Sequence, residues 1–246
     1  MIFKDVSLTS PLDQIIYDDV LLQCCEKGLL PECFRLWESP SVSIVLGRVG
    51  RPEEELWLEQ VVADRVSVFR RSSGGGTVVQ GPGCLNFTFV LSKSNDPRIA
   101  DLRASYQAIL GPVIHLLASA GVAACFCPIS DLAFEGTLRK FSGNAQRRAR
   151  GFILHHGTLL YGMDLKLCQR YLKMPAQAPE YRKGRDHSDF IANLPLTAQQ
   201  LRQSFLTHYV FDKVEHDLHP VERGMLQEER QKDKWVVYNG LAQHDN

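Results

Sequence analysis

The chain has 246 residues, of which 44% are hydrophobic and 23% are charged, a composition typical of folded domains with a buried core rather than of disordered chains. Lysine and arginine together number 28, as do aspartate and glutamate, so the net charge gives no general attraction to nucleic acid or to an anionic membrane. Any basic site must therefore be local.

Targeting signals are absent from the sequence as it stands. No apolar stretch reaches the roughly 20 residues that a membrane-spanning helix needs, and residues 1–5 lack the basic and apolar regions of a signal peptide. We expect a cytoplasmic protein without membrane or nucleic-acid partners. The seven cysteines follow neither a zinc-ribbon nor a paired CxxC spacing, so we expect reduced thiols, most of them packed in the core.

In chain order, the first element is an amphipathic helix at 10–28, with Ser10 as its cap and Gly28 as its stop. Short strands are expected at 33–39, 41–47 and 65–72, and a helix that opens on Pro52 is expected at 51–65. A strand at 84–92 precedes the clearest long helix, 101–121, in which Pro112 predicts a kink.

In the second half, strands are expected at 130–136 and 153–163 and a helix at 197–211. Residues 174–194 are the best candidate for a mobile loop. There is no internal repeat and no long linker. We therefore expect an α+β fold, with a single mixed or antiparallel sheet and flanking helices, in one domain over residues 1–246, with a core of about 12–210 and a C-terminal tail of about 211–246.

The stretch "RRSSGGGTVVQGPGCLNFTFVL", residues 70–91, places two arginines before three glycines. Glycine tolerates unusual dihedrals and lets other groups approach the backbone, so the amides of residues 72–77 can form a nest for phosphate or carboxylate. The stretch matches neither the P-loop nor the GxGxxG fingerprint. A glycine-rich hairpin with two solvated arginines is the alternative.

Two further stretches could carry chemistry. In "RKFSGNAQRRARG", residues 139–151, Lys140 precedes the turn-forming triplet 142–144, which would hold its ammonium near a phosphate or carbonyl; an ordinary basic surface turn is the alternative. In "FILHHGTLL", His155 and His156 point to opposite faces of a strand, so they are poorly placed to share a metal. We expect each histidine to be packed or hydrogen-bonded rather than to be a metal ligand.

The order of these pieces, preceded by "FRLWESPSVSIVLGR", resembles the catalytic domain of the lipoate-protein ligase A family in the biotin and lipoate ligase superfamily. The resemblance covers about residues 12–194. It implies a biotin/lipoate ligase catalytic-domain fold and a two-step reaction: lipoate or octanoate reacts with Mg·ATP to give acyl-AMP, and a lysine of a carrier domain then takes the acyl group. The implied carriers are lipoyl domains of 2-oxoacid dehydrogenase E2 components and the glycine-cleavage H protein.

The resemblance also implies site residues. Lys140 would contact the acyl carbonyl and phosphate and act as the catalytic residue. The other implied substrate-binding residues are Arg70, Arg71, Ser73, Gly74, Gly75, Gly76, Thr77, Asn86, Asp131, Ser142, Gly143, His156, Gly157 and Thr158. Arg70 and Arg71 would grip phosphate, Asn86 and Asp131 would hold nucleotide or metal, and residues 156–158 would form a wall of the acyl pocket.

The chain departs from the family pattern at Gln80, where a histidine is common, and at Gly81. A neutral amide takes no proton, so an acid-base role at Gln80 is in doubt. With 246 residues, the sequence is too short to include the extra C-terminal accessory domain of the bipartite ligases, so we expect that either activation runs without it or a separate partner supplies it.

Two alternatives stay open. Octanoyltransferases and amidotransferases of the superfamily use a cysteine thioester and no ATP, and Cys127 in "ACFCPISDLAF" would be that nucleophile, activated by Lys140; simple packing of Cys125 and Cys127 on one strand face is the competing explanation. A non-catalytic protein that only binds lipoyl domains or a cofactor is the third hypothesis.

Overall fold

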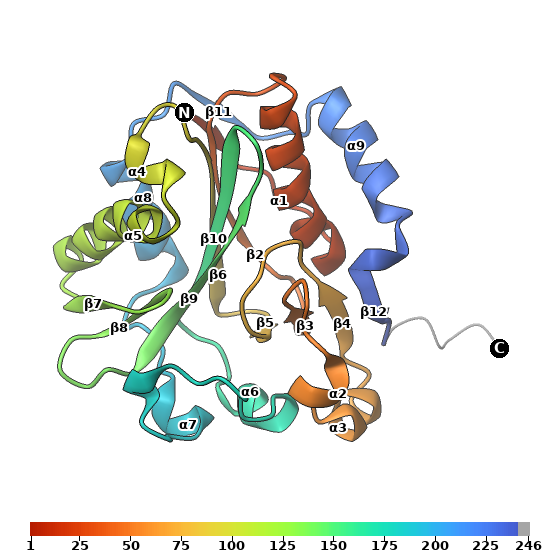
Figure 1. Ribbon diagram of the computed structural model, residues 1–246, viewed down its shortest axis with the longest axis vertical. Helices are drawn as coiled ribbons and strands as arrows, with labels where there is room; N and C mark the ends of the chain where they lie inside the picture. Colours follow the sequence, from red (N-terminus) through yellow and green to blue (C-terminus); the bar gives the residue numbers. More distant parts are fainter. Residues whose placement is uncertain (241–246) are drawn as a thin grey trace.

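The computed structural model describes residues 1–240, so the end of the expected tail, residues 241–246, lies outside the described part. Within residues 1–240 the strands form two sheets (Figure 1). The larger sheet has the order β11 (Lys213–Glu215), β1 (Ile2–Lys4), β2 (Cys33–Glu38), β6 (Cys84–Ser92), β10 (Phe152–Leu160), β9 (Lys140–Arg148), β8 (Asp131–Phe134) and β7 (Ala124–Cys127). The smaller sheet has the order β12 (Val236–Tyr238), β4 (Ser67–Arg70), β3 (Ser43–Leu46) and β5 (Val78–Gln80).

Helices cover both faces of the larger sheet. The long helices α1 (Pro11–Glu26) and α9 (Pro220–Arg230) lie on one side of it, and α5 (Leu102–Ser119) and α8 (Ala198–His208) lie on the other (Figure 1). The shorter helices are α2 (Pro52–Glu55), α3 (Leu58–Ala63), α4 (Pro97–Ala100), α6 (Lys166–Tyr171), η1 (Glu180–Arg182), α7 (His187–Phe190) and η2 (Asp233–Trp235). The helices and the mixed sheets confirm the α+β class, but the strands form a second, smaller sheet beside the single sheet that we expected. None of the helices in residues 1–240 is long and apolar enough to cross a membrane.

The larger sheet is mixed. Strand β1 runs parallel to its neighbours β2 and β11, whereas the neighbouring strands in the series β2, β6, β10, β9, β8 and β7 pair antiparallel. Its centre is the nine-residue pairing of β6 with β10. On the α5 side, apolar side chains of β2 and β6 such as Phe34 and Phe87 pack against Leu110, Val113 and Phe205 from the two helices. This burial of apolar surface is the main stabilising contribution on that face.

The smaller sheet packs against the α1 face of the larger one. Trp37 of β2 lies in one apolar cluster with Val45 of β3, Phe69 of β4 and Ile15 of α1. Residues of β9 and β10 on the same face, such as Gly143 and Thr158, remain partly exposed. The two sheets therefore meet over β2 and leave part of β9 and β10 accessible.

The capping residues in the sequence predicted the bounds of α1 correctly. Ser10 accepts a hydrogen bond from the backbone N of Asp13 at 3.4 Å, and Gly28 follows the helix with φ +69°. The single helix predicted at 51–65 is wrong, because α2 ends at Glu55 and α3 begins at Leu58. Between them the backbone N of Trp57 donates to Tyr171 O at 2.9 Å, a contact with a distant segment that ends the first helix.

The residues after 211 fold back onto the domain. Strand β11 pairs with β1, and β12 pairs with β4. Helix α9 packs along α1, where Glu222 accepts a hydrogen bond from Tyr17 Oη at 2.9 Å and forms an ion pair with Lys4. Both elements that these residues cover, β4 and α1, also carry groups of the candidate site.

Candidate functional site

The glycine-rich stretch forms a loop between β4 and β5, and Arg71 holds this loop by hydrogen bonds. Its buried guanidinium donates from Nη2 to the carbonyl oxygens of Gly74 (2.6 Å) and Gly76 (2.8 Å), and from Nε to Ser73 Oγ (3.0 Å). Burial lowers the pKa of Arg71 to about 10, which leaves it charged at neutral pH. Arg71 therefore holds the shape of the loop.

The amides of the loop are free. Gly74, Gly75 and Gly76 are exposed, and within residues 1–240 their N–H groups donate to no protein acceptor. Gly75 takes φ +83°, and its carbonyl oxygen lies 2.0 Å from the position of a Cβ on Gly47, so only glycine fits at either position. Free, adjacent amides are the requirement of the predicted anion nest, which stays a prediction.

Arg70 ends β4 and binds backbone as well. Its Nη1 donates to the carbonyl oxygens of Gly50 (2.8 Å), Gly47 (3.0 Å) and Arg48 (3.3 Å). These contacts hold residues 47–50 beside the glycine loop, where the Arg48 N–H donates to Ser73 O at 2.8 Å. Phosphate contact from Arg70 or Arg71 remains a prediction. For Arg71 it requires the buried guanidinium to exchange its bonds to the loop carbonyl oxygens.

A hydrogen-bonded chain runs from the loop to α1. Ser73 Oγ lies 2.6 Å from His156 Nε2, and His156 Nδ1 lies 3.3 Å from Asp18 Oδ2. The Asp18 carboxylate also accepts from Arg35 Nη1 (2.8 Å) and Thr88 Oγ1 (2.9 Å). Burial alone would raise the pKa of Asp18, but the bond to His156 and the charge of Arg35 outweigh it and lower that pKa.

The order Asp18, His156, Ser73 is that of a carboxylate, a base and a serine nucleophile. Ser73 is only 1% exposed, however, and its Oγ already accepts a hydrogen bond from Arg71. A substrate carbonyl therefore has no path to this hydroxyl. The three residues hold the glycine loop in place and do not form a nucleophilic site. At the other end of the loop, Thr77 Oγ1 donates to Glu55 of α2.

Four of the predicted site residues share one row across the larger sheet. Asn86 of β6 lies opposite Thr158 of β10, and Gly143 of β9 lies opposite Asp131 of β8. The Gly143 N–H donates to Thr158 Oγ1 at 3.4 Å, which joins the two pairs. Trp37 of β2 lies opposite Asn86 and extends the row toward the smaller sheet.

Lys140 joins this row through an irregularity of β9. Leu132 lies opposite Ser142, whereas Ala133 lies opposite Lys140, so Phe141 is an extra residue without a partner on β8. Such a bulge changes the face on which the following side chains lie. It places Lys140 Nζ 2.8 Å from Asp131 Oδ1, with the Lys140 side chain 26% exposed.

Ser142 and Gly157 lie away from this row. Ser142 Oγ is buried and accepts from Asn144 Nδ2 at 3.1 Å. A Cβ on Gly157 would lie 1.9 Å from Asn144 Oδ1 and 2.5 Å from Phe87 Cζ, so the space beside Gly157 is already filled by protein. The triplet 142–144 is not the predicted turn, because it lies within strand β9 and pairs on both sides.

The two histidines point to opposite faces, as expected. His155 is fully buried on the α5 side beside Phe87 and Tyr106, and burial lowers its pKa to about 3. His156 faces Asp18 on the α1 side. Residues 1–240 contain no group of three or more His, Cys, Asp or Glu side chains that could hold a metal ion.

Gln80, where the chain departs from the family pattern, binds another predicted site residue. Its Nε2 donates to Asn86 Oδ1 at 2.9 Å, and both side chains are buried. Gln80 thus fixes the orientation of the Asn86 amide rather than exchanging protons.

Cys127 does not have the environment of a reactive thiolate. It lies opposite Asp131 and is 4% exposed. Burial, together with Cys125 and the nearby Asp131, raises the pKa of Cys127 to about 12, although Arg185 lowers it slightly. A nucleophilic cysteine requires the opposite shift.

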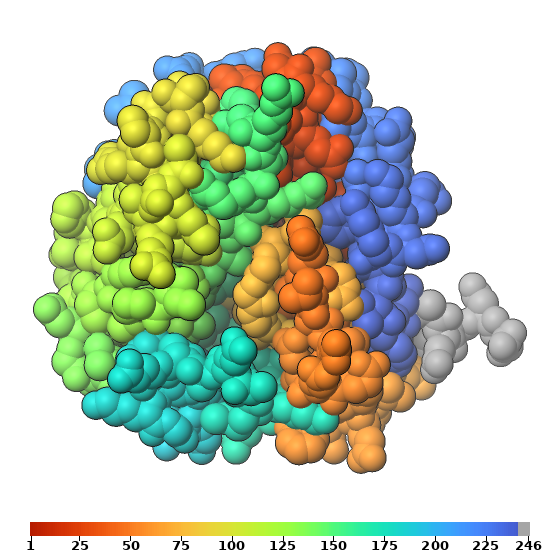
Figure 2. Space-filling view, in the orientation of Figure 1, coloured from red at the N-terminus to blue at the C-terminus, as the bar shows by residue number. Residues whose placement is uncertain are grey.

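Residues 174–194 cover the β8–β9 side of the site. Tyr181 Oη donates to Asp131 Oδ2 at 2.7 Å, and burial followed by the Asp131 charge raises the pKa of Tyr181. The Ala192 N–H donates to Lys140 O at 2.8 Å. Figure 2 shows the surface dipping between this teal segment, the green strands and the orange segment that precedes the glycine loop.

Sequence reasoning missed Asp18 and Tyr181. Asp18 lies among apolar residues of α1, and an acid at that position of a helical stripe signals a buried partner. Tyr181 lies in an irregular segment without such a signal.

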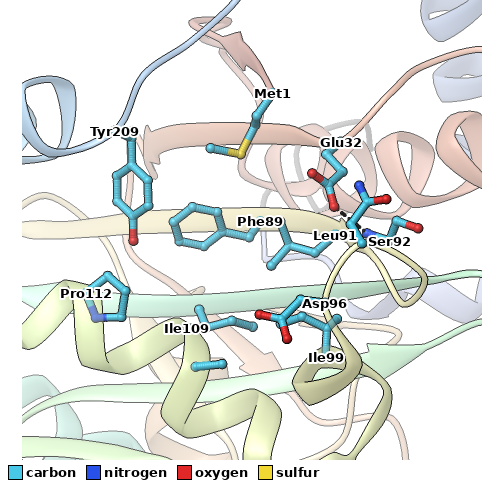
Figure 3. A pocket seen from close by; sticks show the side chains of 12 residues that line it. Met1, Glu32, Phe89, Leu91, Ser92, Asp96, Ile99, Ile109, Pro112 and Tyr209 are labelled. Carbon is cyan, nitrogen blue, oxygen red and sulfur yellow. Dashed lines mark hydrogen bonds between the residues drawn. The ribbon is translucent and has the colours of Figure 1, made fainter.

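A separate hollow of about 230 Å³, lined by Phe89, Ile109 and Tyr209 among others (Figure 3), lies on the α5 side and contains none of the predicted site residues.

Comparisons with known proteins identify the family. Residues 10–210 match the family model described as the lipoyl protein ligase A/B catalytic domain. The chain belongs to this family. The resemblance noted from the motifs is thereby confirmed, since the match includes the glycine loop, Lys140 and residues 156–158.

The proteins that are similar to this chain include lipoate-protein ligases and a lipoyl amidotransferase. A probable lipoate-protein ligase A of Mycoplasma pneumoniae is 33% identical over 175 residues, which cover 70% of this chain and 50% of that protein. The lipoate-protein ligase LplJ of Bacillus subtilis is 30% identical over 191 residues, covering 75% and 56%. The human mitochondrial lipoyl amidotransferase LIPT1 is 28% identical over 191 residues, covering 74% and 48%. The chain thus spans about half the length of these relatives.

Solved structures share the fold. A bipartite lipoate-protein ligase of Thermoplasma acidophilum, described with its E2 lipoyl domain, has a TM-score of 0.75 at 19% identity and covers 92% of this chain and 90% of that chain. A lipoate-protein ligase A bound with ATP has a TM-score of 0.74 at 19% identity, covering 92% of both chains. The fold is therefore that of the lipoate ligases.

Proposed function

We propose that this protein is an ATP-dependent ligase that attaches lipoate or octanoate to a lysine of a lipoyl carrier domain. In the first step a carboxylate oxygen of the acid attacks the α-phosphorus of ATP and pyrophosphate leaves. In the second step the carrier amine attacks the acyl carbonyl, AMP leaves, and the amine gives up a proton. Family membership supports the reaction class, the names of the ligase relatives support lipoate as a substrate, and a solved ligase with this fold is described as bound with ATP.

The observation that carries the proposal is the position of Lys140, whose ammonium lies on the face of the sheet that also holds the free amides of the glycine loop. Gly75 lies over Ala145, with 3.8 Å between a Cβ on Gly75 and the Ala145 Cβ. Ala145 and Gly143 are two residues apart on one strand, about 7 Å. A phosphate or acyl carbonyl between the loop and Lys140 would meet amide N–H groups on one side and a cation on the other.

The other predicted residues have places in this scheme. The row from Gly143 to Trp37 crosses three strand spacings, about 14 Å, and we propose that an acyl chain follows it toward the apolar cluster of Trp37 and Val45. Asp131 would release Lys140 to the substrate and keep its bond to Tyr181. Magnesium usually binds through one or two carboxylates and the phosphates themselves, so it would enter with ATP.

The partners that we propose are the lipoyl domains of E2 components and the H protein. A solved structure with this fold is described with its E2 lipoyl domain, which supports this class of partner. A separate accessory domain is an optional further partner in this proposal.

The alternative is a cysteine-dependent transferase without ATP. The amidotransferase among the relatives favours it, whereas the raised pKa of Cys127 disfavours it. A non-catalytic binder of lipoyl domains is the third possibility, and the Lys140 geometry disfavours it.

Two assays separate the three functions. The purified protein is incubated with ATP, labelled pyrophosphate and either lipoate or octanoate, and label is followed into ATP. Acid-dependent exchange supports the ligase. Acyl transfer between carriers without ATP, lost in Cys127→Ser, supports the transferase, and the absence of both activities supports the binder.

A further inference from the structure

We infer that Asp18 and His156 are positioning residues, which fix the height of the glycine loop above β9 and β10 through the hydroxyl of Ser73. The inference deepens the proposed function, because it says which groups place the loop amides relative to Lys140. The position of the loop is nevertheless a property of the protein alone, and it is measurable without any substrate.

The chain of hydrogen bonds has a defined direction. Arg71 Nε–H donates to Ser73 Oγ at 3.0 Å, so the hydroxyl proton of Ser73 is free to point at His156 Nε2, 2.6 Å away. His156 then carries its proton on Nδ1 and donates it to Asp18 Oδ2 at 3.3 Å. The carboxylate of Asp18 thereby selects the tautomer that accepts from the loop.

Asp18 anchors this series of hydrogen bonds in the core. Its carboxylate bonds to Arg35, Thr88 and His156, which lie side by side on β2, β6 and β10. Asp18 is 2% exposed and belongs to α1, which α9 covers. The loop is thus tied to buried residues in the central strands of the larger sheet.

Ser73 is the point at which the loop is held from three sides. Its carbonyl accepts from the Arg48 N–H at 2.8 Å, and its hydroxyl contacts both Arg71 and His156. The free amides follow it directly in the chain. Since these amides and Lys140 would act on one substrate, a small shift of Ser73 changes the geometry of the site.

The first test measures the loop without substrate. Residue-resolved hydrogen exchange is followed at the Arg48 amide, which bonds to Ser73 O, and at the Arg71 amide, which bonds to Leu46 O at 3.0 Å. In His156→Ala and Ser73→Ala we expect exchange about tenfold faster at Arg48 and unchanged at Arg71. His155→Gln, the neighbouring buried histidine on the opposite face, is the matched control and keeps wild-type exchange at Arg48. Wild-type protection of Arg48 in His156→Ala would overturn the inference.

The second test is a spectroscopic reading of the His156 tautomer, which the direction of the hydrogen bonds fixes. Nitrogen NMR shifts of His156 should show the proton on Nδ1 in the wild type, and Ser73→Ala should leave that proton in place because Asp18 still accepts it. A wild-type His156 protonated on Nε2 and bare at Nδ1 would contradict the direction of the chain and overturn the inference.

The third test links position to rate. His156→Ala should lower kcat of lipoate-dependent pyrophosphate exchange about tenfold or more, with partial rescue in His156→Gln, whose amide can both accept and donate. Equal rates for His156→Ala and wild type would overturn the inference. If the wild type exchanges no pyrophosphate, the proposed ligase fails, while the Arg48 measurement still decides the positioning role.

Discussion

The ammonium of Lys140 lies 3.0 Å from the point where a Cβ on Gly143 would stand, and its Cε lies 3.1 Å from that point. Gly143 has no positive φ, so its conformation is open to any residue. A glycine is therefore needed at position 143 to leave room for the Lys140 side chain, and not to allow an unusual backbone conformation.

Gly143→Ala tests this relationship. The added methyl would displace the Lys140 side chain by a few tenths of an ångström or more, and we expect lipoate-dependent pyrophosphate exchange to fall about 10- to 100-fold with little loss of stability. Gly111→Ala in α5, where nothing lies within 4 Å of the added methyl, is the control and should keep full activity. Normal exchange in Gly143→Ala would contradict the assigned position of Lys140.

Lys140→Ala should abolish adenylation, by a factor of at least about 100, because it removes the cation expected to stabilise the developing charge. The fold should persist, since Asp131 keeps its 2.7 Å bond to Tyr181. Pyrophosphate exchange measures the loss, and a circular dichroism melt checks the fold. Exchange at the normal rate would remove Lys140 from its proposed role.

Cys127→Ser should leave ATP-dependent transfer unchanged. With its pKa raised to about 12, the thiol stays protonated through neutral pH and should resist iodoacetamide until the solution is strongly alkaline. Mass spectrometry of the alkylated protein measures this, with the more exposed Cys125 as the internal comparison. Rapid labelling of Cys127 at pH 7, with loss of transfer in the serine variant, would favour the cysteine-dependent mechanism instead.

Acid should destabilise the protein through His155. Burial holds its pKa at about 3, whereas an unfolded histidine titrates near its ordinary value of about 6.5, so the unfolded chain binds more protons between these limits. Stability from this group is therefore present above pH 6.5 and falls by about 1.4 kcal/mol per pH unit between pH 6 and pH 4.

Urea unfolding at several pH values measures this slope. His155→Gln should be less stable at pH 7 and should lose stability less steeply toward pH 4. His115→Gln, at an exposed position on α5, is the control and should keep the wild-type slope. An unchanged slope in His155→Gln would show that other groups carry the acid sensitivity.

Tyr181→Phe should loosen residues 174–194, because it removes the hydroxyl that bonds to Asp131. Loss of one hydrogen bond predicts trypsin cleavage after the exposed Lys183 that is about 2- to 10-fold faster. Tyr171→Phe, which removes the hydroxyl bonded to Asp64, is the matched control. We also expect residues 174–194 to become more ordered over the bound acyl-adenylate, so a stable lipoyl-AMP analogue should slow the cleavage in the wild type. Equal proteolysis with and without the analogue would count against this ordering.

The sequence by itself determined the features that depend on neighbouring residues. Ser10 and Gly28 bracket α1 because caps act within one turn, and the alternation at 84–92 marks β6 because side chains alternate along any strand. The order of the glycine stretch, Lys140 and His156-Gly157-Thr158 identified the family, since three ordered motifs are far more specific than one.

Only the tertiary structure decided how these motifs meet. The sequence placed Lys140 beside a turn, whereas pairing with β8 creates the bulge at Phe141 that brings Lys140 to the face of Asp131. Register and bulges are set by the partner strand, so no local pattern predicts them. Arg71 likewise binds the loop carbonyls, and Asp18 reaches His156 across 138 residues of chain, because a buried polar group takes whatever partner the fold supplies.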